Sequence, residues 1–131
     1  MRIMLDTNVF ISALLFPNSI AGRLLVNVLT DHNLVLCSYI IEELHSVFER
    51  KFRSKIDDLE IFLSELSCDL VYTPKKIDET KYPYIRDIND LPILVSALIA
   101  DVDMLITGDK DFYEVDIEKP QIVSPAEFMR M

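Results

Sequence analysis

The chain has 131 residues, an apolar fraction of 50% and a formal net charge of −9. This length predicts one domain, residues 1–131, with a substantial core, and so apolar a composition argues against disorder. The acidic balance argues against nonspecific nucleic-acid binding, which basic surface normally drives.

The first third of the chain alternates apolar strands with amphipathic helices. Residues 2–5 predict a short buried strand, and Ser19 predicts the N-cap of a helix that ends near residue 29. Residues 34–36 predict a second strand, followed by a helix that Ser38 is expected to cap. The side chains expected on the inward face of this helix are Ile41, Leu44, Val47 and Phe48.

The central third holds one more helix and one more strand before a long loop. Ser54 and Asp57 form a variant of the capping box, with Asp in place of Glu or Gln, and predict the start of a helix. Residues 70–72 predict a third strand, which Pro74 stops. The stretch 74–89 has two prolines and no clear period, so we expect it to be mostly loop.

The last third returns to alternating helices and strands. Asp90 is expected to cap a helix that tolerates Pro92 in its first turn. Residues 104–106 and 122–123 predict the fourth and fifth strands, and residues 124–127 combine an N-cap Ser, a Pro at N1 and a capping-box Glu. This alternation predicts an α/β fold, with a parallel sheet of four to five strands covered on both faces.

Neither the apolar segments nor the cysteines point to a membrane or a secreted protein. The apolar runs are too short to span a bilayer, and the N-terminus enters a strand without the basic and apolar regions of a signal peptide. Cys37 and Cys68 have no metal-ligand spacing, so we expect two reduced thiols. We therefore expect a cytoplasmic protein without membrane association.

Four carboxylates are expected to meet at one edge of the predicted sheet. Asp6 directly follows the first strand, and Asp109 follows the fourth. Glu43 lies one turn into the helix after the second strand, and Asp90 begins the helix that leads to the fourth. Taken singly, each has an ordinary structural explanation as a helix cap, a solvated side chain or a turn residue. Together they fall where α/β folds build their sites.

Repulsion between these carboxylates determines what must accompany them. Two unit charges about 5 Å apart cost roughly 3 kcal/mol at an effective dielectric near 20. Several such pairs would rival the stability of a whole domain. Either some carboxyls stay protonated or cations compensate them. Mg²⁺ or Mn²⁺ satisfies this requirement well, because both ions prefer carboxylate and water ligands.

Four segments of the chain resemble the successive motifs of PIN domains. They are Leu5–Val9, Ile41–Leu44, Arg86–Asp90 and Ile106–Asp111, in the order found in that family. They are most similar to the bacterial and archaeal branch labelled as toxins of toxin–antitoxin pairs. The resemblance implies a three-layer α/β/α fold and a Mg²⁺- or Mn²⁺-dependent endoribonuclease.

The resemblance also assigns roles position by position. Asn8 and Thr107 match the family's polar neighbours of the acids, and Asp87 and Asp111 match accessory acids expected to orient ligands. The positions that match the acidic quartet, expected to bind metal and catalyse, are Asp6, Glu43, Asp90 and Asp109.

The implied reaction is metal-ion hydrolysis of RNA. One or two cations would bind the scissile phosphate and lower the pKa of an attacking water, leaving 5′-phosphate and 3′-hydroxyl ends. The partners implied are an RNA substrate, a cognate antitoxin protein and a second copy of the chain in a homo-oligomer.

Basic residues are crowded into one part of the chain. Arg50, Lys51, Arg53 and Lys55 occupy four of six consecutive positions. They predict either an RNA-binding patch or a solvated helix end. The two histidines, His32 and His45, are expected to be structural or surface residues.

Other classes of protein begin in a similar way but fit less well. A haloacid-dehalogenase-type phosphatase needs a second Asp at the position of Asn8, and a receiver domain needs an Asp at the end of the third strand, near Tyr72. A non-catalytic regulatory, protein-binding or RNA-binding module on the same fold remains an alternative. So does a nuclease that acts on DNA, because the metal chemistry does not distinguish the two sugars.

Overall fold

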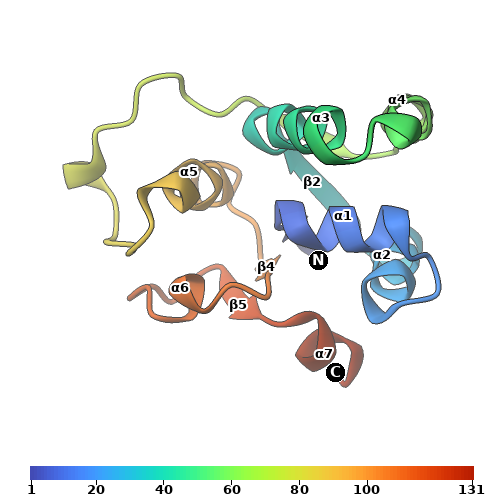
Figure 1. The fold of residues 1–131 in the computed structure, drawn as a ribbon. Coiled ribbons are helices and arrows are strands. Elements are labelled where there is room, and N and C mark those ends of the chain that lie inside the picture. Colours follow the sequence, from blue (N-terminus) through green and yellow to red (C-terminus); the bar gives the residue numbers. More distant parts are fainter.

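The computed structural model describes all residues, 1–131, and is built around a five-stranded sheet (Figure 1). The order of the strands is β3-β2-β1-β4-β5, and every neighbouring pair is parallel. The strands are β1 (Arg2–Leu5), β2 (Asn33–Cys37), β3 (Asp69–Val71), β4 (Met104–Ile106) and β5 (Gln121–Val123). The prediction of a parallel sheet with four to five strands is confirmed.

Helices cover both faces of the sheet. In Figure 1, α1, α2 and α7 lie on one side and α5 on the other, so the three-layer prediction is confirmed. The helices are α1 (Thr7–Leu15), α2 (Ile20–Asp31), α3 (Ser38–Lys51), α4 (Ile56–Glu65), α5 (Leu91–Ile99), α6 (Lys110–Tyr113) and α7 (Pro125–Met129). Three short 3-10 turns complete the chain, namely η1 (Arg53–Lys55), η2 (Glu79–Lys81) and η3 (Ile88–Asp90).

The core lies between the central strands and the helices on both faces. It is one cluster of 32 buried hydrophobic residues, and all three residues of β4 belong to it. The register pairs Leu5 with Ile106, so β1 and β4 end side by side. The strand order reverses between these two strands, and α/β folds bind ligands at such a reversal. The residues that follow β1 and β4 are therefore held at this point by a closely packed core.

Two of the predicted helix starts have the expected caps. Ser19 precedes α2, and its hydroxyl accepts a hydrogen bond from the amide of Gly22 at 3.2 Å. Ser124 and Glu127 form the predicted capping box of α7, with reciprocal bonds of 3.0 and 3.1 Å. In both cases a side-chain oxygen satisfies a backbone amide that has no partner within the helix.

Two other predicted caps are wrong. Ser38 is the first residue of α3, not its cap, and its hydroxyl accepts from the amide of Thr73 at the end of β3, at 2.9 Å. Ser54 lies exposed in η1, and α4 begins after Lys55 without a side-chain cap. In the first case a tertiary partner recruits the hydroxyl, and in the second the 3-10 turn displaces it from the helix start.

The chain turns directly from β1 into α1, an element that the sequence patterns did not predict. Asp6 is its N-cap, and no loop separates strand and helix. A glycine lets α2 pack closely against the turn after α1, because a Cβ at Gly22 would lie 2.1 Å from the carbonyl oxygen of Pro17. No single helix is long and apolar enough to cross a membrane, and α1 and α2 together reach that length only across a bend of 106°. Cys37 and Cys68 are both free thiols.

Candidate metal centre

Asp6 is the most buried acid at the end of the central strands. Its side chain is fixed on both oxygens, because Oδ1 accepts from the amide of Thr7 and Oδ2 from the hydroxyl of Thr107, each at 2.7 Å. Burial raises the pKa of Asp6, and these two hydrogen bonds oppose the shift. Thr107 was predicted as a polar neighbour, and the structure places it in direct contact with the acid.

Asp109 is positioned by the same threonine. The hydroxyl of Thr107 accepts a hydrogen bond from the Asp109 amide at 3.0 Å, so one side chain sets the positions of two acids. Asp109 is also the N-cap of α6, where its Oδ1 accepts from the amide of Asp111 at 2.9 Å. The turn is held in place by Tyr113, whose hydroxyl donates to the carbonyl of Thr107 at 2.8 Å. One oxygen of Asp109 therefore serves the turn, and the acid still lies beside Asp90.

Glu43 reaches the centre from α3, where it is half-buried. Its Oε1 accepts a hydrogen bond of 2.6 Å from the hydroxyl of Thr7. Burial raises the pKa of Glu43, and the charge of Asp6 raises it further. Thr7 thus links two acids from different elements, a role that sequence reasoning missed. The available signal was its position directly after Asp6 in a motif already singled out.

Asp90 is the acid whose environment is least satisfied. It precedes α5, as predicted, but its side chain makes no capping bond, so that part of the prediction is wrong. Its Oδ2 is buried without a hydrogen-bond partner. Burial and the adjacent Asp109 carboxylate raise the pKa of Asp90 to about 8, and the charges of Asp6 and Asp87 contribute. An unpartnered buried oxygen among carboxylates is where a cation would be most stabilising.

The two accessory acids extend the cluster on one side. Asp87, Asp90 and Asp111 each offer a carboxylate oxygen within 4.8 Å of the others. Asp87 caps η3 by accepting from the amide of Asn89 at 3.0 Å. Asp111 is held by both oxygens, which accept from the guanidinium of Arg86 at 2.8 and 2.9 Å. Its charge is therefore already compensated, a pairing that sequence reasoning did not foresee.

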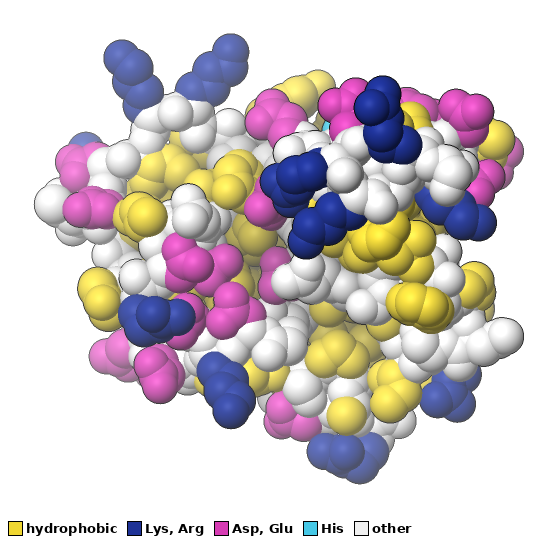
Figure 2. Space-filling model, in the orientation of Figure 1, with side chains coloured by type: hydrophobic (Ala, Val, Ile, Leu, Met, Phe, Trp, Pro, Cys, Tyr) yellow, Lys and Arg dark blue, Asp and Glu magenta, His cyan; other side chains and the backbone are white.

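The remaining predicted residues lie around the centre rather than in it. Asn8 is exposed in the first turn of α1. The four basic residues are exposed at the end of α3 and in η1, and are Arg50, Lys51, Arg53 and Lys55. Figure 2 shows Asp and Glu side chains beside a hollow near the middle of this face, with Lys and Arg side chains over the end of α3 on its other side.

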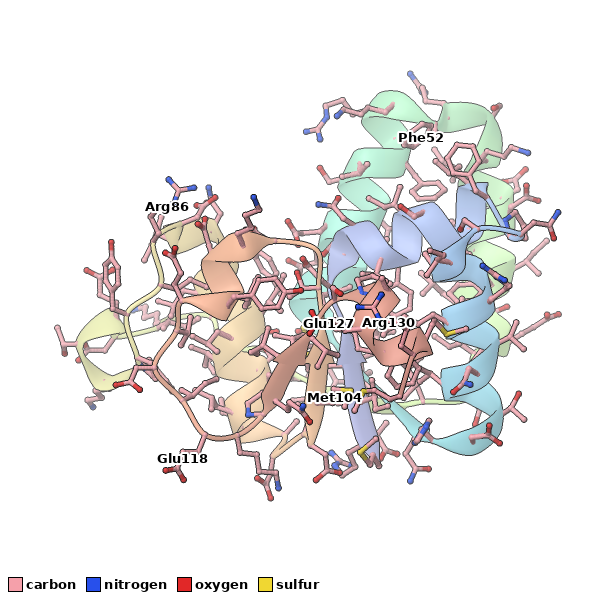
Figure 3. The ribbon with its side chains drawn as sticks, turned by 90° about the horizontal axis from the view of Figure 1, so that it is seen from below. Phe52, Arg86, Met104, Glu118, Glu127 and Arg130 are labelled. Atoms are coloured by element: carbon pink, nitrogen blue, oxygen red, sulfur yellow. The ribbon has the colours of Figure 1, made fainter.

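Figure 3 shows the same arrangement from another direction. Met104, at the start of β4, lies at one end of the sheet, and Arg86 and Phe52 lie at the opposite end on either side. Phe52 directly follows α3, so the end of that helix projects past the strands on the side opposite Arg86. The acids that follow the strands therefore lie at the end of the sheet that is flanked by Arg86 and by the end of α3.

The histidines take part in other contacts. His45 bonds to Glu60 on α4 and to the carbonyl of Ile41, and His32 packs edge-on against Phe128. Neither forms a hydrogen bond with an acid of the centre, which agrees with their predicted structural role.

The donor set fits a hard divalent cation. The acids repel one another in sequence. The charge of Asp6 raises the pKa of Glu43, and the charge of Asp109 raises the pKa of both Asp6 and Asp90. All the ligand atoms on offer are carboxylate oxygens, the type that Mg²⁺ and Mn²⁺ prefer. The four predicted acids influence one another in pairs, and the group of three whose oxygens lie within 4.8 Å of one another is Asp87, Asp90 and Asp111.

Comparisons with known proteins agree with this fold. A family model described as a PIN domain matches residues 2–111. A chain in the crystal structure of VapBC2 from Rickettsia felis, bound to a DNA fragment from their promoter, superposes with a TM-score of 0.68 and 20% identity, over 94% of this chain and 97% of that one. A chain in the structure of VapBC-1 from nontypeable Haemophilus influenzae superposes with a TM-score of 0.65 and 21% identity, over 96% of this chain and 99% of that one. No curated protein matches the sequence.

Proposed function

The chain belongs to the PIN domain family, and from this premise we propose that it is a ribonuclease that cleaves RNA with the help of Mg²⁺ or Mn²⁺. The observation that carries the proposal is the unpartnered Oδ2 of Asp90 within a cluster of acids at the reversal of the strand order. The residues proposed to hold the metal and to catalyse are Asp6, Glu43, Asp90 and Asp109.

Each proposed ligand has a support that orients it. Thr7 donates to Asp6 through its amide and to Glu43 through its hydroxyl, and Thr107 donates to Asp6. These bonds leave the acids little freedom to move apart, which keeps the donor oxygens preorganised for a cation. When bound, divalent cations supply Lewis-acid polarisation of the scissile phosphate and acidify water. The chain itself contributes the fixed positions of the donor oxygens.

Asp87 and Asp111 are proposed to play different supporting roles. The guanidinium of Arg86 neutralises the carboxylate of Asp111 and ties it to the segment before η3, while the amide of Asp111 donates to Asp109. Asp87 shapes the turn that carries Asp90 by capping η3. Both therefore act on a proposed ligand through the backbone that presents it.

The proposed substrate needs a positively charged contact on an acidic protein. The exposed residues at the end of α3 and in η1, which include Arg50 and Lys51, supply one beside the acids. Phosphate contacts by such side chains contribute affinity without sequence preference. Asn8, exposed at the start of α1, is proposed to contact the substrate or water near Asp6.

A protein partner is proposed from the toxin–antitoxin resemblance and from the similar chains in the VapBC structures. A small antitoxin encoded beside this chain would bind it and suppress cleavage. Co-expression of the two proteins should give a stable complex that lacks ribonuclease activity, and light scattering would report whether the chain alone is a homo-oligomer. An active complex would contradict the proposed inhibition.

The deciding experiment uses labelled single-stranded RNA and DNA of the same sequence. With Mn²⁺ the wild-type chain should cleave the RNA, EDTA should stop the reaction, and Asp90→Asn should be inactive. Asp116→Asn is the matched control, because Asp116 is exposed and lies outside the acidic cluster. Cleavage of the DNA alone would favour a DNA-directed nuclease, and RNA binding without any cleavage would favour the non-catalytic module.

A further inference from the structure

A cavity of about 660 Å³ opens beside the acidic centre. It lies between the start of α3, the end of β3 and the first turn of α5, and its lining includes Tyr39, Glu42, Tyr72, Lys75 and Pro92. Its volume is within the range of roughly 300–1,000 Å³ that is typical of small-molecule sites. None of the functions proposed above uses this cavity.

Tyr39 joins the cavity to the acids. Its ring lines the cavity, and its hydroxyl donates to the carbonyl of Asn89, next to Asp90, at 3.1 Å. Burial raises the pKa of Tyr39, and the charges of Glu43 and Asp90 raise it further. A group bound against the ring of Tyr39 would therefore lie next to a phosphate at the acidic centre.

The wall of the cavity is fixed by hydrogen bonds between three elements. Thr73 is the common partner, because its amide donates to the hydroxyl of Ser38 at 2.9 Å and its own hydroxyl accepts from the amide of Tyr39 at 3.2 Å. The Thr73 hydroxyl also lies 2.8 Å from that of the buried Ser96 on α5. The end of β3 is thus tied to α3 and α5, and the cavity is formed before any ligand arrives.

The side chains at its rim suit an unpaired nucleotide. The ring of Tyr72 is 77% exposed, so one face is free to stack on a base. Lys75 lines the same cavity, and Lys76 follows it in the chain, so cationic side chains are available for the backbone phosphate. Glu42 also lines the cavity, is exposed, and can accept hydrogen bonds from the N–H groups of a base. The lining therefore offers an acceptor for a base and a cation for a phosphate.

We propose that this cavity binds an unpaired nucleotide beside the cleaved phosphate, with its base stacked on Tyr72 and its phosphate at Lys75. The proposal deepens the proposed ribonuclease function and rests on it. It commits the substrate to single-stranded RNA, because a base that is stacked within a duplex cannot enter the cavity.

The test compares two similarly exposed tyrosines that line different cavities. Tyr72→Ala removes the stacking platform, and Tyr84→Ala is the matched control, because Tyr84 is 80% exposed and lines a different cavity. Binding of a short fluorescent single-stranded RNA is measured by anisotropy with Mg²⁺ present, in the Asp90→Asn background to prevent cleavage. We expect Tyr72→Ala to weaken binding about 5- to 100-fold. Tyr84→Ala should leave it unchanged.

Three further measurements separate stacking from a general loss of binding. Replacing single nucleotides of the RNA by abasic ones should weaken binding at one position for Asp90→Asn alone, and not when Tyr72→Ala is added to it. Tyr72→Phe should bind like the parent, because stacking does not need the hydroxyl. An RNA that carries 5-iodouridine should cross-link to the peptide that contains Tyr72.

The outcome is distinguishable from that of the proposed function. If the wild-type chain binds single-stranded RNA through Tyr72 but never cleaves it, the nuclease proposal fails and this site stands. If the wild-type chain cleaves RNA while Tyr72→Ala retains its Kd and KM, the site is overturned and the nuclease stands. Loss of binding in Tyr84→Ala instead of Tyr72→Ala would also overturn it.

Discussion

Acidic side chains occur at both edges of the sheet, meaning where its strands begin and where they end. The acids at one edge are paired with cations, and most of those at the other are not. At the edge where the strands begin, Asp69 pairs with Arg2 at 2.7 Å, and Asp103 lies 3.5 Å from the ammonium of Lys119. The Arg2 amide donates to Asp103, and this bond, followed by the Lys119 charge, lowers the pKa of Asp103. These acids are compensated by the chain itself.

At the edge where the strands end, the acids face one another. Burial is the first cause of the raised pKa of Asp6, Glu43 and Asp90, and other carboxylates add to each shift. Among the acids here only Asp111 has an ion-pair partner, Arg86. Titratable groups perturbed by burial and by like charges are typical of functional sites, whereas compensated pairs are typical of structural ones. The contrast shows which acids need a ligand from outside the chain.

The largest expected effect is on the rate of RNA cleavage. It should separate substitutions of acids where the strands end from a substitution of an acid where they begin. Asp6→Asn and Asp90→Asn should each reduce cleavage more than the 10- to 100-fold that is typical of residues that only support a metal ligand. Asp69→Asn, at the opposite edge, should keep wild-type activity and change stability by at most about 1 kcal/mol, because its ion pair is exposed. Initial rates on labelled RNA and urea unfolding measure these effects. Full activity in both amide variants at the acidic centre would end the site assignment.

A divalent metal should stabilise the protein through the acidic centre alone. A ligand that binds only the folded state at 100 times its Kd adds about 2.7 kcal/mol of unfolding free energy. We expect Mn²⁺ to raise the unfolding midpoint of the wild-type chain and of Asp69→Asn, and not that of Asp90→Asn. Without metal, Asp90→Asn should be at least as stable as the wild type, because the amide removes the cost of keeping this carboxyl protonated above its ordinary pKa. Stabilisation of Asp90→Asn by Mn²⁺ would place the metal elsewhere.

The accessory acids should show an intermediate effect. Asp87→Asn and Asp111→Asn are expected to lose about 10- to 100-fold in activity, recovered at higher Mn²⁺, because both residues shape turns that carry proposed ligands. Arg86→Ala should reproduce the effect of Asp111→Asn, because it removes the ion-pair partner of that carboxylate. The measurement is the rate as a function of Mn²⁺ concentration. Loss that metal does not rescue would make that acid a direct ligand, and wild-type behaviour would make it ordinary loop surface.

The pH dependence of stability should differ between the edges. Without metal the folded state raises the pKa of Asp90 from 3.8 to about 8, so the folded protein holds a proton that the unfolded chain has lost. The unfolding free energy should therefore fall as pH rises from about 4 towards 8. The pKa of Asp103 is lowered in the folded protein. Its contribution to the unfolding free energy is therefore lost only as pH falls below the ordinary pKa of an aspartate. Urea unfolding midpoints, measured in EDTA as a function of pH, should fall between about pH 4 and 8. Asp90→Asn should reduce this slope, and Asp103→Asn should retain it. An unchanged slope in Asp90→Asn would contradict the prediction.

The smallest effect concerns cations beyond the acidic edge. Arg50→Ala with Lys51→Ala should weaken RNA binding for all sequences and flatten its salt dependence by about 0.7 per lost phosphate contact on single strands. Lys119→Ala is the control, because Lys119 is a cation of the opposite edge, engaged with Asp101 and Asp103. Binding isotherms over a range of salt concentrations measure the slope. An equal slope in the wild type and the double variant would leave the basic residues as a solvated helix end.

The order of elements was largely predictable because it depends on local patterns. Short apolar runs identified every strand, and Ser19 and the residues 124–127 identified two helix starts. The acids Asp6 and Asp109 could be placed at one edge because parallel strands end together. These inferences use contacts between residues that are close in the chain or related by regular geometry.

What tertiary structure decided is the partner of each polar side chain. The sequence marks Asp90 as a cap, yet burial beside Asp109 leaves one of its oxygens without a partner. Thr107 donates to Asp6 across 101 positions of the chain, and Arg86 binds Asp111 across 25. A hydrogen bond depends on distances of about 3 Å, which are set only when the core fixes the relative positions of the elements. The sequence therefore determined which acids reach the edge, and packing determined which of them remain without a cation.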